Sequence, residues 1–268
     1  MKINENLTLA ERVKAAIVAK IVKGGFVRED ESSRIRLSDV PYYLKWATGY
    51  GGIWLVGETE QGEEFFYTPA AWDGLTDEQR DILRPRAAGM LFRAFGHEFV
   101  IALQDCPDSH AWCPELDESG VPAQVEISNK SGINMANIDF DGAGNTEEML
   151  KVECPAAIAA VNLKDEGIHG AGLADWYLPA YGQWSLIFMY RNKINAAIKT
   201  FLGAVSYLSQ AVYWTSTPSG TTSAWVLSNP SLTSYTTGGD TRTRTEKCKV
   251  RACSQYKCTK RYMTYGED

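Results

Sequence analysis

The sequence lacks the features of an exported or membrane-spanning chain. Its first segment, MKINENLTLAERVKAAIVAKIVKGG, is amphipathic and carries acidic residues, with no continuous apolar core and no small-residue cleavage site. No window approaches the roughly 20 apolar residues that a membrane helix requires. We expect a chain that is made in the cytoplasm without a signal peptide and that does not insert into a membrane. A place in a phage virion, or another export route, would account for a role outside the cell.

Basic charge and clustered catalytic groups are also scarce. The formal net charge is −6 at pH 7, which argues against a nucleic-acid partner, because phosphate binding normally needs a basic face. The three histidines, His97, His110 and His169, are scattered, and no two of them have metal-ligand spacing. No Ser/His/Asp grouping is evident, and GAGNT lacks the lysine of a phosphate-binding loop. We therefore predict a non-enzymatic protein with no cofactor.

The six cysteines do not form a recognisable zinc motif. The series Cys248-x4-Cys253-x4-Cys258 matches none of the usual zinc spacings, and on a strand Cys253 would point away from the other two. Without an export signal, reduced thiols are expected, and free cysteine often behaves as a small buried hydrophobe. We predict that all six, which include Cys106, Cys113 and Cys154, are reduced and bind no metal.

The amino-acid composition of the chain, with 44% hydrophobic and 22% charged residues, is typical of a soluble globular protein. Thr8 and Glu11 form a capping box for an amphipathic N-terminal helix. Its apolar stripe either docks on its own domain or serves in anchoring or homo-oligomerisation. Two aromatic and β-branched runs in residues 53–67 predict a β-hairpin, and residues 75–83 predict a short helix with a second capping box.

The sequence changes character near residue 92, and we predict a domain boundary there. Residues 1–91 would form an N-terminal helix and hairpin module with an anchoring or oligomerisation role. Residues 92–268 would form a ligand-binding domain. In this second part, helix signals such as DFDGAGNTEEML and PAAIAAVNL come early. Short strand-like pieces, AVYWTST, SAWVLSN, SLTSYTT and CKVRACSQY, come late, so the order favours an α+β fold.

Five short motifs occur in order over about 120 residues: DGAGNTEEM, DWYLPAYGQW, YWTST, AWVLSN and KVRAC. This series resembles a family of bacterial and phage proteins with a C-type lectin-like fold. The usual run of that family is Gly-x-x-Asn-Thr, Asp-Trp-Tyr-Leu-Pro, Tyr-Trp-Ser-Ser-Thr-Glu, Ala-Trp and Val-Arg-Ala. The resemblance covers about residues 92–256 and implies two helices beside a twisted antiparallel sheet. It also implies that the frame of the fold includes Trp176, Leu178, Pro179, Trp214 and Trp225.

Some members of this family are variable proteins of diversity-generating retroelements, whose lectin-like domain carries a hypervariable receptor-binding surface. The matching feature here is the polar stretch after YWTST: 16 of the 33 residues from 215 to 247 are serine or threonine. Such a stretch is expected to be mostly exposed, and its hydroxyls would make adaptable contacts as antibody loops do. We therefore predict a diversifiable contact surface formed by Thr217, Ser219, Thr221, Thr222, Ser223, Trp225, Leu227, Asn229, Ser231, Thr233, Tyr235, Thr237, Asp240, Arg242 and Arg244.

Two groups within this set keep alternative interpretations. Alternation places Arg242 and Arg244 on one face of a strand, where they either meet an acidic ligand group or protect an edge strand by charge. Trp225 and Tyr235 either stack on a sugar or pack in the core, and we favour the core for the tryptophans.

The segment DFDGAGNTEE superficially suggests a calcium loop through Asp139, Asp141 and Asn145. However, Ala143 occupies a ligand position, and Leu150 stands where a bidentate glutamate belongs. The Glu-Pro-Asn, Gln-Pro-Asp and Trp-Asn-Asp signatures of calcium-dependent lectins do not occur either. We predict a turn leading into a capped helix, and no metal.

We expect the chain to be a non-enzymatic binding or adhesion protein whose partner is a protein or glycan receptor. A structural or assembly subunit of a phage tail or surface fibre is the alternative. Formylglycine-generating enzymes and related oxidases share the lectin-like architecture and use cysteine or clustered histidines. Cys253 in VRAC lies near where such a chain ends, and we interpret it as buried packing.

Overall fold

The computed structural model describes residues 52–62, 64–95, 97–115, 121–163, 173–203, 208, 211–228 and 239–256. The chain divides into two compact units. One comprises Ile53–Phe92 and Glu98–Lys257, and the other comprises Met1–Gly52, Arg93–His97 and Cys258–Asp268. The predicted N-terminal helix lies outside the described residues, so its anchoring or oligomerisation role stays a prediction.

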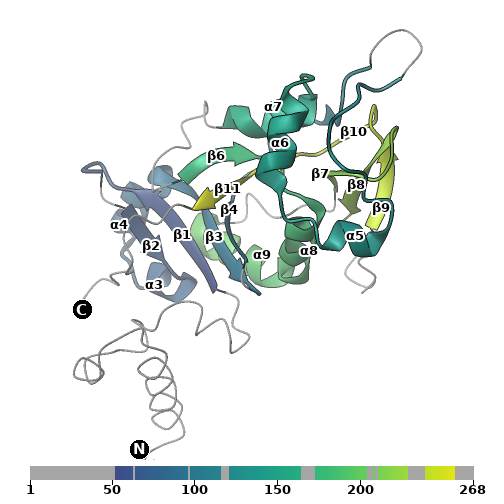
Figure 1. Ribbon diagram of the computed structural model, residues 1–268. Helices are drawn as coiled ribbons and strands as arrows, with labels where there is room; N and C mark the ends of the chain where they lie inside the picture. Colours follow the sequence, from purple (N-terminus) through teal and green to yellow (C-terminus); the bar gives the residue numbers. More distant parts are fainter. Residues whose placement is uncertain are drawn as a thin grey trace, which may run out of the picture. The chain divides into compact units, whose positions relative to one another are not determined.

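The larger sheet has six strands in the order β2-β1-β3-β4-β11-β6 (Figure 1). Its strands are β1 (Gly52–Glu58), β2 (Glu64–Tyr67), β3 (Ala87–Ala94), β4 (His97–Ile101), β6 (Leu173–Tyr177) and β11 (Cys253–Tyr256). The hairpin predicted for residues 53–67 is confirmed, because β1 and β2 pair antiparallel, and Gly62 in the turn adopts a φ of 78° that suits glycine. β11 pairs antiparallel with both β4 and β6, so the end of the described chain lies between two strands of this sheet and not at its edge.

The predicted domain boundary between residues 91 and 92 falls inside β3. β3 lies between β1 and β4 in the same sheet. Residues 53–92 also belong to the compact unit that contains Glu98–Lys257. The change to strand-like sequence at residue 98 therefore marks a new strand of the same sheet. Composition alone does not distinguish that case from the start of a new domain.

Within the described residues there are seven α-helices: α3 (Pro69–Asp73), α4 (Asp77–Leu83), α5 (Ile133–Asn137), α6 (Gly142–Leu150), α7 (Pro155–Val161), α8 (Tyr181–Met189) and α9 (Arg191–Leu202). The predicted capping box of α4 is confirmed: the Thr76 hydroxyl accepts from the Gln79 N–H, and the Gln79 side chain accepts from the Thr76 N–H. α6 is a capped helix, as predicted, and its cap is Asp141. Pro155 opens α7, the helix predicted at PAAIAAVNL.

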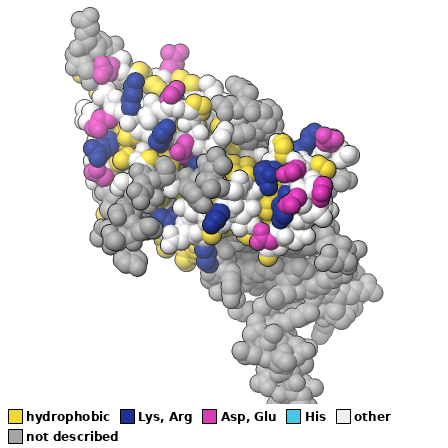
Figure 2. Space-filling view, turned by 180° about the vertical axis from the view of Figure 1, so that it is seen from behind, with side chains coloured by type: hydrophobic (Ala, Val, Ile, Leu, Met, Phe, Trp, Pro, Cys, Tyr) yellow, Lys and Arg dark blue, Asp and Glu magenta, His cyan; other side chains and the backbone are white. Residues whose placement is uncertain are grey.

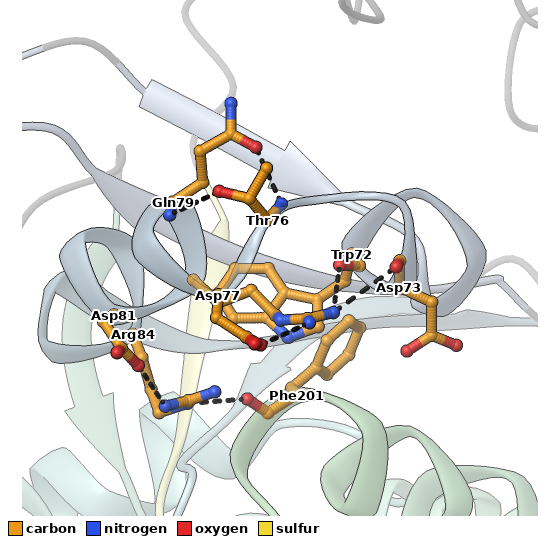
Figure 3. Close-up of polar contacts among 9 residues, drawn as sticks. Trp72, Asp73, Thr76, Asp77, Gln79, Asp81, Arg84 and Phe201 are labelled. Carbon is orange, nitrogen blue, oxygen red and sulfur yellow. Dashed lines mark hydrogen bonds and ion pairs between the residues drawn. The ribbon is translucent and has the colours of Figure 1, made fainter.

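Contacts at the end of α9 tie it to α3 and to the residues that follow α4 (Figure 3). The buried Trp72 ring of α3 meets Phe201 edge-on, with 6.0 Å between ring centroids. Arg84 donates through Nε to the carbonyl of Phe201 at 3.2 Å. A cation beside the last carbonyls of a helix complements the helix dipole, so this contact supports the helix end.

A second sheet has three strands, β7 (Val212–Pro218), β8 (Ser223–Ser228) and β9 (Gly239–Thr243), in that order. Both pairs are antiparallel, and the register shifts between Trp214 and Pro218. A two-stranded sheet pairs β5 (His110–Ala111) with β10 (Lys247–Cys248). The strands predicted at AVYWTST and SAWVLSN are thus confirmed, whereas SLTSYTT lies outside the described residues. The fold is mixed α+β with antiparallel sheets, and it contains more helices than the two that the resemblance implies.

Buried indole rings join these elements. Four tryptophans donate the indole N–H to a backbone carbonyl: Trp112 to Thr215 at 2.7 Å, Trp184 to Trp214 at 3.1 Å, Trp214 to His110 at 2.7 Å and Trp225 to Lys130 at 2.6 Å. Each bond bridges residues far apart in sequence or fixes an irregular loop. All five residues predicted to belong to the frame are buried, which confirms that prediction: Trp176, Leu178, Pro179, Trp214 and Trp225.

Candidate ligand-binding surface

The predicted contact residues fall into three groups in the structure. Those outside the described residues are Asn229, Ser231, Thr233, Tyr235 and Thr237. Those that are buried are Thr217, Trp225, Leu227 and Arg244. Those at least partly exposed are Ser219, Thr221, Thr222, Ser223, Asp240 and Arg242. We call the exposed group, together with the exposed Thr241 and Thr243, the hydroxyl surface.

The first half of the hydroxyl surface is the turn between β7 and β8. The N–H groups of Ser219 and Gly220 both donate to the carbonyl of Ser223, at 3.1 and 3.2 Å. The Ser219 hydroxyl lies 2.8 Å from the Ser223 hydroxyl. These bonds close the turn on itself and leave Thr221 and Thr222 exposed at its tip. Two adjacent threonines on a closed turn offer both donors and acceptors to a partner.

The second half is β9, which pairs with β8 and brings its side chains beside the turn. Cross-strand partners are Ser223 with Thr243 and Ala224 with Arg242. Arg242 forms exposed ion pairs with Asp240 at 3.3 Å and with Glu246 at 3.7 Å. Pairs of this kind contribute little to stability, so these charged groups can exchange their partners at small energetic cost.

Arg244 lies beneath this surface, which corrects the prediction that it shares an exposed strand face with Arg242. β9 ends at Thr243, so the alternation that relates the two arginines does not extend to Arg244. Its side chain is 2% exposed, and its guanidinium lies 4.5 Å from the centroid of the Trp112 ring. It donates to the carbonyl of Gly220 at 2.6 Å, and its own N–H donates to the carbonyl of Thr222 at 3.0 Å. Burial lowers the pKa of this guanidinium. Arg244 therefore holds the turn from below and does not meet a ligand.

The hydroxyls at the start of the polar stretch are also buried, which corrects the expectation that the stretch is exposed throughout. Thr215, Ser216 and Thr217 have no exposed surface. The Thr215 hydroxyl donates to the carbonyl of Trp225 at 2.8 Å. The Thr217 hydroxyl donates to Asp139 Oδ2 at 2.7 Å and accepts from the N–H of Tyr181 at 2.8 Å. Buried hydroxyls are tolerated where partners satisfy them, and the partners of Thr217 come from distant parts of the chain.

Trp225 and Leu227 belong to the core and not to the contact surface. Trp225 is 6% exposed and packs on Tyr181, with 5.2 Å between ring centroids. Leu227 is 1% exposed. Because the indole face of Trp225 is covered, it is not available to stack on a sugar. The alternative that placed Trp225 in the frame is therefore confirmed.

The segment that resembled a calcium loop forms a capped turn, as predicted. The Asp141 side chain accepts from the N–H of Gly144 at 2.9 Å and caps α6. Asp139 is 8% exposed, and its Oδ2 also accepts from the Asn145 side chain at 3.1 Å. The carboxylates are thus engaged with protein donors that link α6 to β7. Within the described part of the chain, no group of three or more His, Cys, Asp or Glu side chains is placed to hold a metal.

The five described cysteines are all free and buried, as the packing interpretation requires. Cys253 has no exposed surface, and burial strongly raises the pKa of its thiol, which disfavours the nucleophilic thiolate. Cys253 pairs across the sheet with Ile101 and Tyr177, in the middle of the core. Its surroundings are those of a packing residue.

Local sequence signals could have identified some neighbours of the surface that were not predicted. Thr241 and Thr243 follow from the alternation of β9. Gln124 has no such signal: its side chain donates to the carbonyl of Thr221 at 3.3 Å across 97 residues of sequence. The segment around Gln124 therefore borders the turn only through the tertiary fold.

The charged side chains on the face drawn in Figure 2 are of both signs and interspersed, without a broad region of one sign. Arg242 is an example of such mixing, because its guanidinium lies beside the carboxylates of both Asp240 and Glu246. Within the described residues, no helix has both the length and the apolar character needed to cross a bilayer.

Comparison with known proteins gives limited similarity. No protein-family model and no curated protein matches the chain. Among solved structures, the chain is similar to a fimbrial protein from Bacteroides ovatus, with 14% sequence identity and a TM-score of 0.45. The similarity covers 76% of this chain and 43% of the fimbrial protein, so the chain spans less than half of that protein's length. Similarity of this extent assigns neither a family nor a function to the chain.

Proposed function

We propose that this chain is a non-enzymatic ligand- or receptor-binding protein that presents the hydroxyl surface on a C-type lectin-like scaffold. The observation that carries the proposal is the contrast within one short segment. Thr221 and Thr222 are exposed at the tip of the turn, while Arg244 fixes the same turn from below through the carbonyls of Gly220 and Thr222. A rigid backbone with exposed, chemically adaptable side chains binds a partner with a small loss of conformational entropy.

The partner in this proposal is a protein or glycan receptor. Threonine and serine hydroxyls both donate and accept hydrogen bonds, and Arg242 with Asp240 adds one charge of each sign. This set suits a polar partner rich in hydroxyl, amide or carboxylate groups. We further propose that the exposed positions tolerate diversification, as in the variable proteins of diversity-generating retroelements. A near-copy of the coding segment for residues 213–256, beside a reverse-transcriptase gene and differing chiefly at adenines, would support that part. Without such a copy, the diversification proposal fails and the binding proposal stands.

The experiment compares surface variants with a matched control. The triple variant Thr221→Ala/Thr222→Ala/Arg242→Ala removes exposed groups of the hydroxyl surface. The control Asn192→Ala/Lys199→Ala removes exposed polar groups of α9. Labelled full-length protein is applied to an array of defined bacterial and animal glycans and to intact bacterial cells. We expect the triple variant to lose at least 90% of the binding while its melting temperature stays within about 2 °C of the wild-type value. Binding that survives in the triple variant, or that is absent in the wild type, would contradict the proposal.

A structural or assembly role is the second candidate, and exposed apolar residues favour it. Ile133, Met135 and Ile138 lie at α5 with 37%, 49% and 69% of their surfaces exposed. Exposed apolar side chains close together are typical of protein contact sites. Under this candidate, replacing Met135 and Ile138 with serine would shift an assembled form toward monomer in size-exclusion chromatography with light scattering, and the hydroxyl-surface triple variant would not.

A further inference from the structure

β9 is an outer strand of the three-stranded sheet, and some of its backbone groups point away from that sheet. Among the described strands, β9 neighbours β8 alone (Figure 1). The N–H of Arg244, just after β9, donates to the carbonyl of Thr222, so these two residues form a hydrogen-bonded pair of the antiparallel ladder. Such pairs alternate along a ladder, so Arg242 directs its backbone groups toward β8. The backbone groups of Thr241 and Thr243 therefore point outward.

Carboxylates accept from both of these outward N–H groups. The N–H of Thr241 donates to Asp240 Oδ1 at 2.9 Å, and the N–H of Thr243 donates to Glu246 Oε1 at 3.2 Å. The side chains of Asp240 and Glu246 are 56% and 47% exposed. Polar contacts of exposed side chains contribute little to stability, so both N–H groups can exchange these acceptors for the carbonyls of an incoming strand at small energetic cost.

The sequence of β9 is complementary to itself in charge. When two copies of β9 pair antiparallel with Thr241 opposite Thr241, Asp240 of each copy lies opposite Arg242 of the other copy. Thr241 then forms a hydrogen-bonded pair with its counterpart, because its backbone groups point outward. Asp240 and Arg242 form the neighbouring non-hydrogen-bonded pairs, in which opposed side chains lie closest. The ion pair that these two residues form within one chain, at 3.3 Å, is thereby replaced by two ion pairs between the chains.

We propose that two copies of this chain associate through the outer edges of β9 in this register and join their three-stranded sheets. A two-fold interface uses the edge of each copy once, so association ends at the dimer. One pair of short strands is a small interface, and we expect a dissociation constant on the order of 100 μM.

This inference is independent of the proposed receptor binding, because Thr221 and Thr222 take no part in the strand pairing. It does restrict the variation of β9. Where Arg242 varies among natural copies of the chain, Asp240 should change with it, so that the opposed side chains keep opposite charges.

The test measures sedimentation velocity of the full-length chain from about 1 to 500 μM, where the wild type should change from monomer to dimer. Asp240→Arg opposes two positive charges in each cross-strand pair, and Arg242→Asp opposes two negative charges. Each variant alone should therefore dimerise at least about tenfold more weakly than the wild type. An equimolar mixture of the two variants restores opposite charges at both pairs and should form a heterodimer, which native mass spectrometry identifies by its mass.

Two further variants make the result specific. The charge-exchanged variant Asp240→Arg/Arg242→Asp should dimerise like the wild type, because each opposed pair again carries opposite charges. The control Thr221→Ala/Thr222→Ala, which removes exposed hydroxyls outside the strand pairing, should also dimerise like the wild type. The proposal is overturned if the wild type stays monomeric at the highest concentration, if the single charge variants dimerise as the wild type does, or if their mixture forms no heterodimer. If a single variant does not fold, a monomeric charge-exchanged variant overturns the proposal and a dimeric one supports it.

Discussion

Arg242 and Arg244 are two residues apart in the segment TRTRT, yet their surroundings predict very different responses to truncation. Arg244→Ala removes a charge-assisted hydrogen bond to the carbonyl of Gly220, worth about 1.5–3 kcal/mol, and a cation–π contact with Trp112, worth about 0.5–2 kcal/mol. The substitution also leaves a void among buried groups. The cost of burying the guanidinium, which lowers its pKa, offsets part of these contributions. We expect a net loss of about 2–4 kcal/mol in the free energy of unfolding.

Arg242→Ala removes only ion pairs whose side chains are 42% to 56% exposed. Exposed pairs of this kind are worth about 0–1 kcal/mol, so the expected loss is below about 1 kcal/mol. Arg244→Lys keeps the charge but loses the planar group that lies over the ring, and we expect an intermediate loss.

The assay is urea-induced unfolding of the three variants and the wild type, together with amide hydrogen exchange. The loss for Arg244→Ala corresponds to a decrease of about 5–12 °C in melting temperature for a protein of this size. The amides of Ser219 and Gly220, which close the turn, should exchange faster in Arg244→Ala than in Arg242→Ala. The reasoning is refuted if the stability of Arg244→Ala is within about 0.5 kcal/mol of the wild type, which is the range of neutral surface substitutions, or if both alanine variants lose the same stability.

Two further predictions concern buried groups. Asp139→Ala leaves the Thr217 hydroxyl and the Asn145 amide without their carboxylate, so we expect the free energy of unfolding in urea to fall by about 2–4 kcal/mol. The capping variant Asp141→Ala should lose only about 1 kcal/mol. Equal losses would mean that the hydrogen bonds of Asp139 contribute no more than an ordinary helix cap. Burial raises the pKa of the Cys248 thiol to about 11 from an ordinary value of 9.0, so its contribution to stability is complete below about pH 9 and is lost as the pH rises toward 11. Cys248→Ala should therefore lose less stability than the wild type between pH 8 and pH 11 in unfolding titrations, and identical pH profiles would contradict this.

Local features of the fold could be predicted from the sequence because their physics is local. The capping box of Thr76 and Gln79 and the cap at Asp141 each act within three residues. The position of β11 between β4 and β6 depends on pairing across more than 70 residues, and nothing in the sequence of β11 indicates its neighbours. The predicted boundary near residue 92 falls inside β3, and a strand gives no local sign of the sheet that it joins.

The candidate surface shows a related distinction, because composition measures polarity and does not reveal which polar groups find partners. Thr215 and Thr217 are as polar as Thr221 and Thr222, but the former meet the carbonyl of Trp225 and the carboxylate of Asp139 inside the fold. One run of hydroxyls therefore lies in two environments: its first residues are bonded inside the fold, and Thr221 and Thr222 are exposed.

This division restricts which positions can vary if the surface is diversified. Each buried hydroxyl is matched to a particular partner, so replacing it would leave that partner unsatisfied at a cost of about 1–3 kcal/mol. The exposed Thr221, Thr222 and Thr241 have no comparable burial, and changes there should cost about 0.5 kcal/mol or less. Arg244, like the buried hydroxyls, should not tolerate substitution despite its charge, because its guanidinium is buried against the turn that it supports. Among natural copies of this segment, variable and constant positions should therefore alternate along the chain, with Arg242 variable and Arg244 constant. A binding surface can diversify only where its supporting residues stay constant.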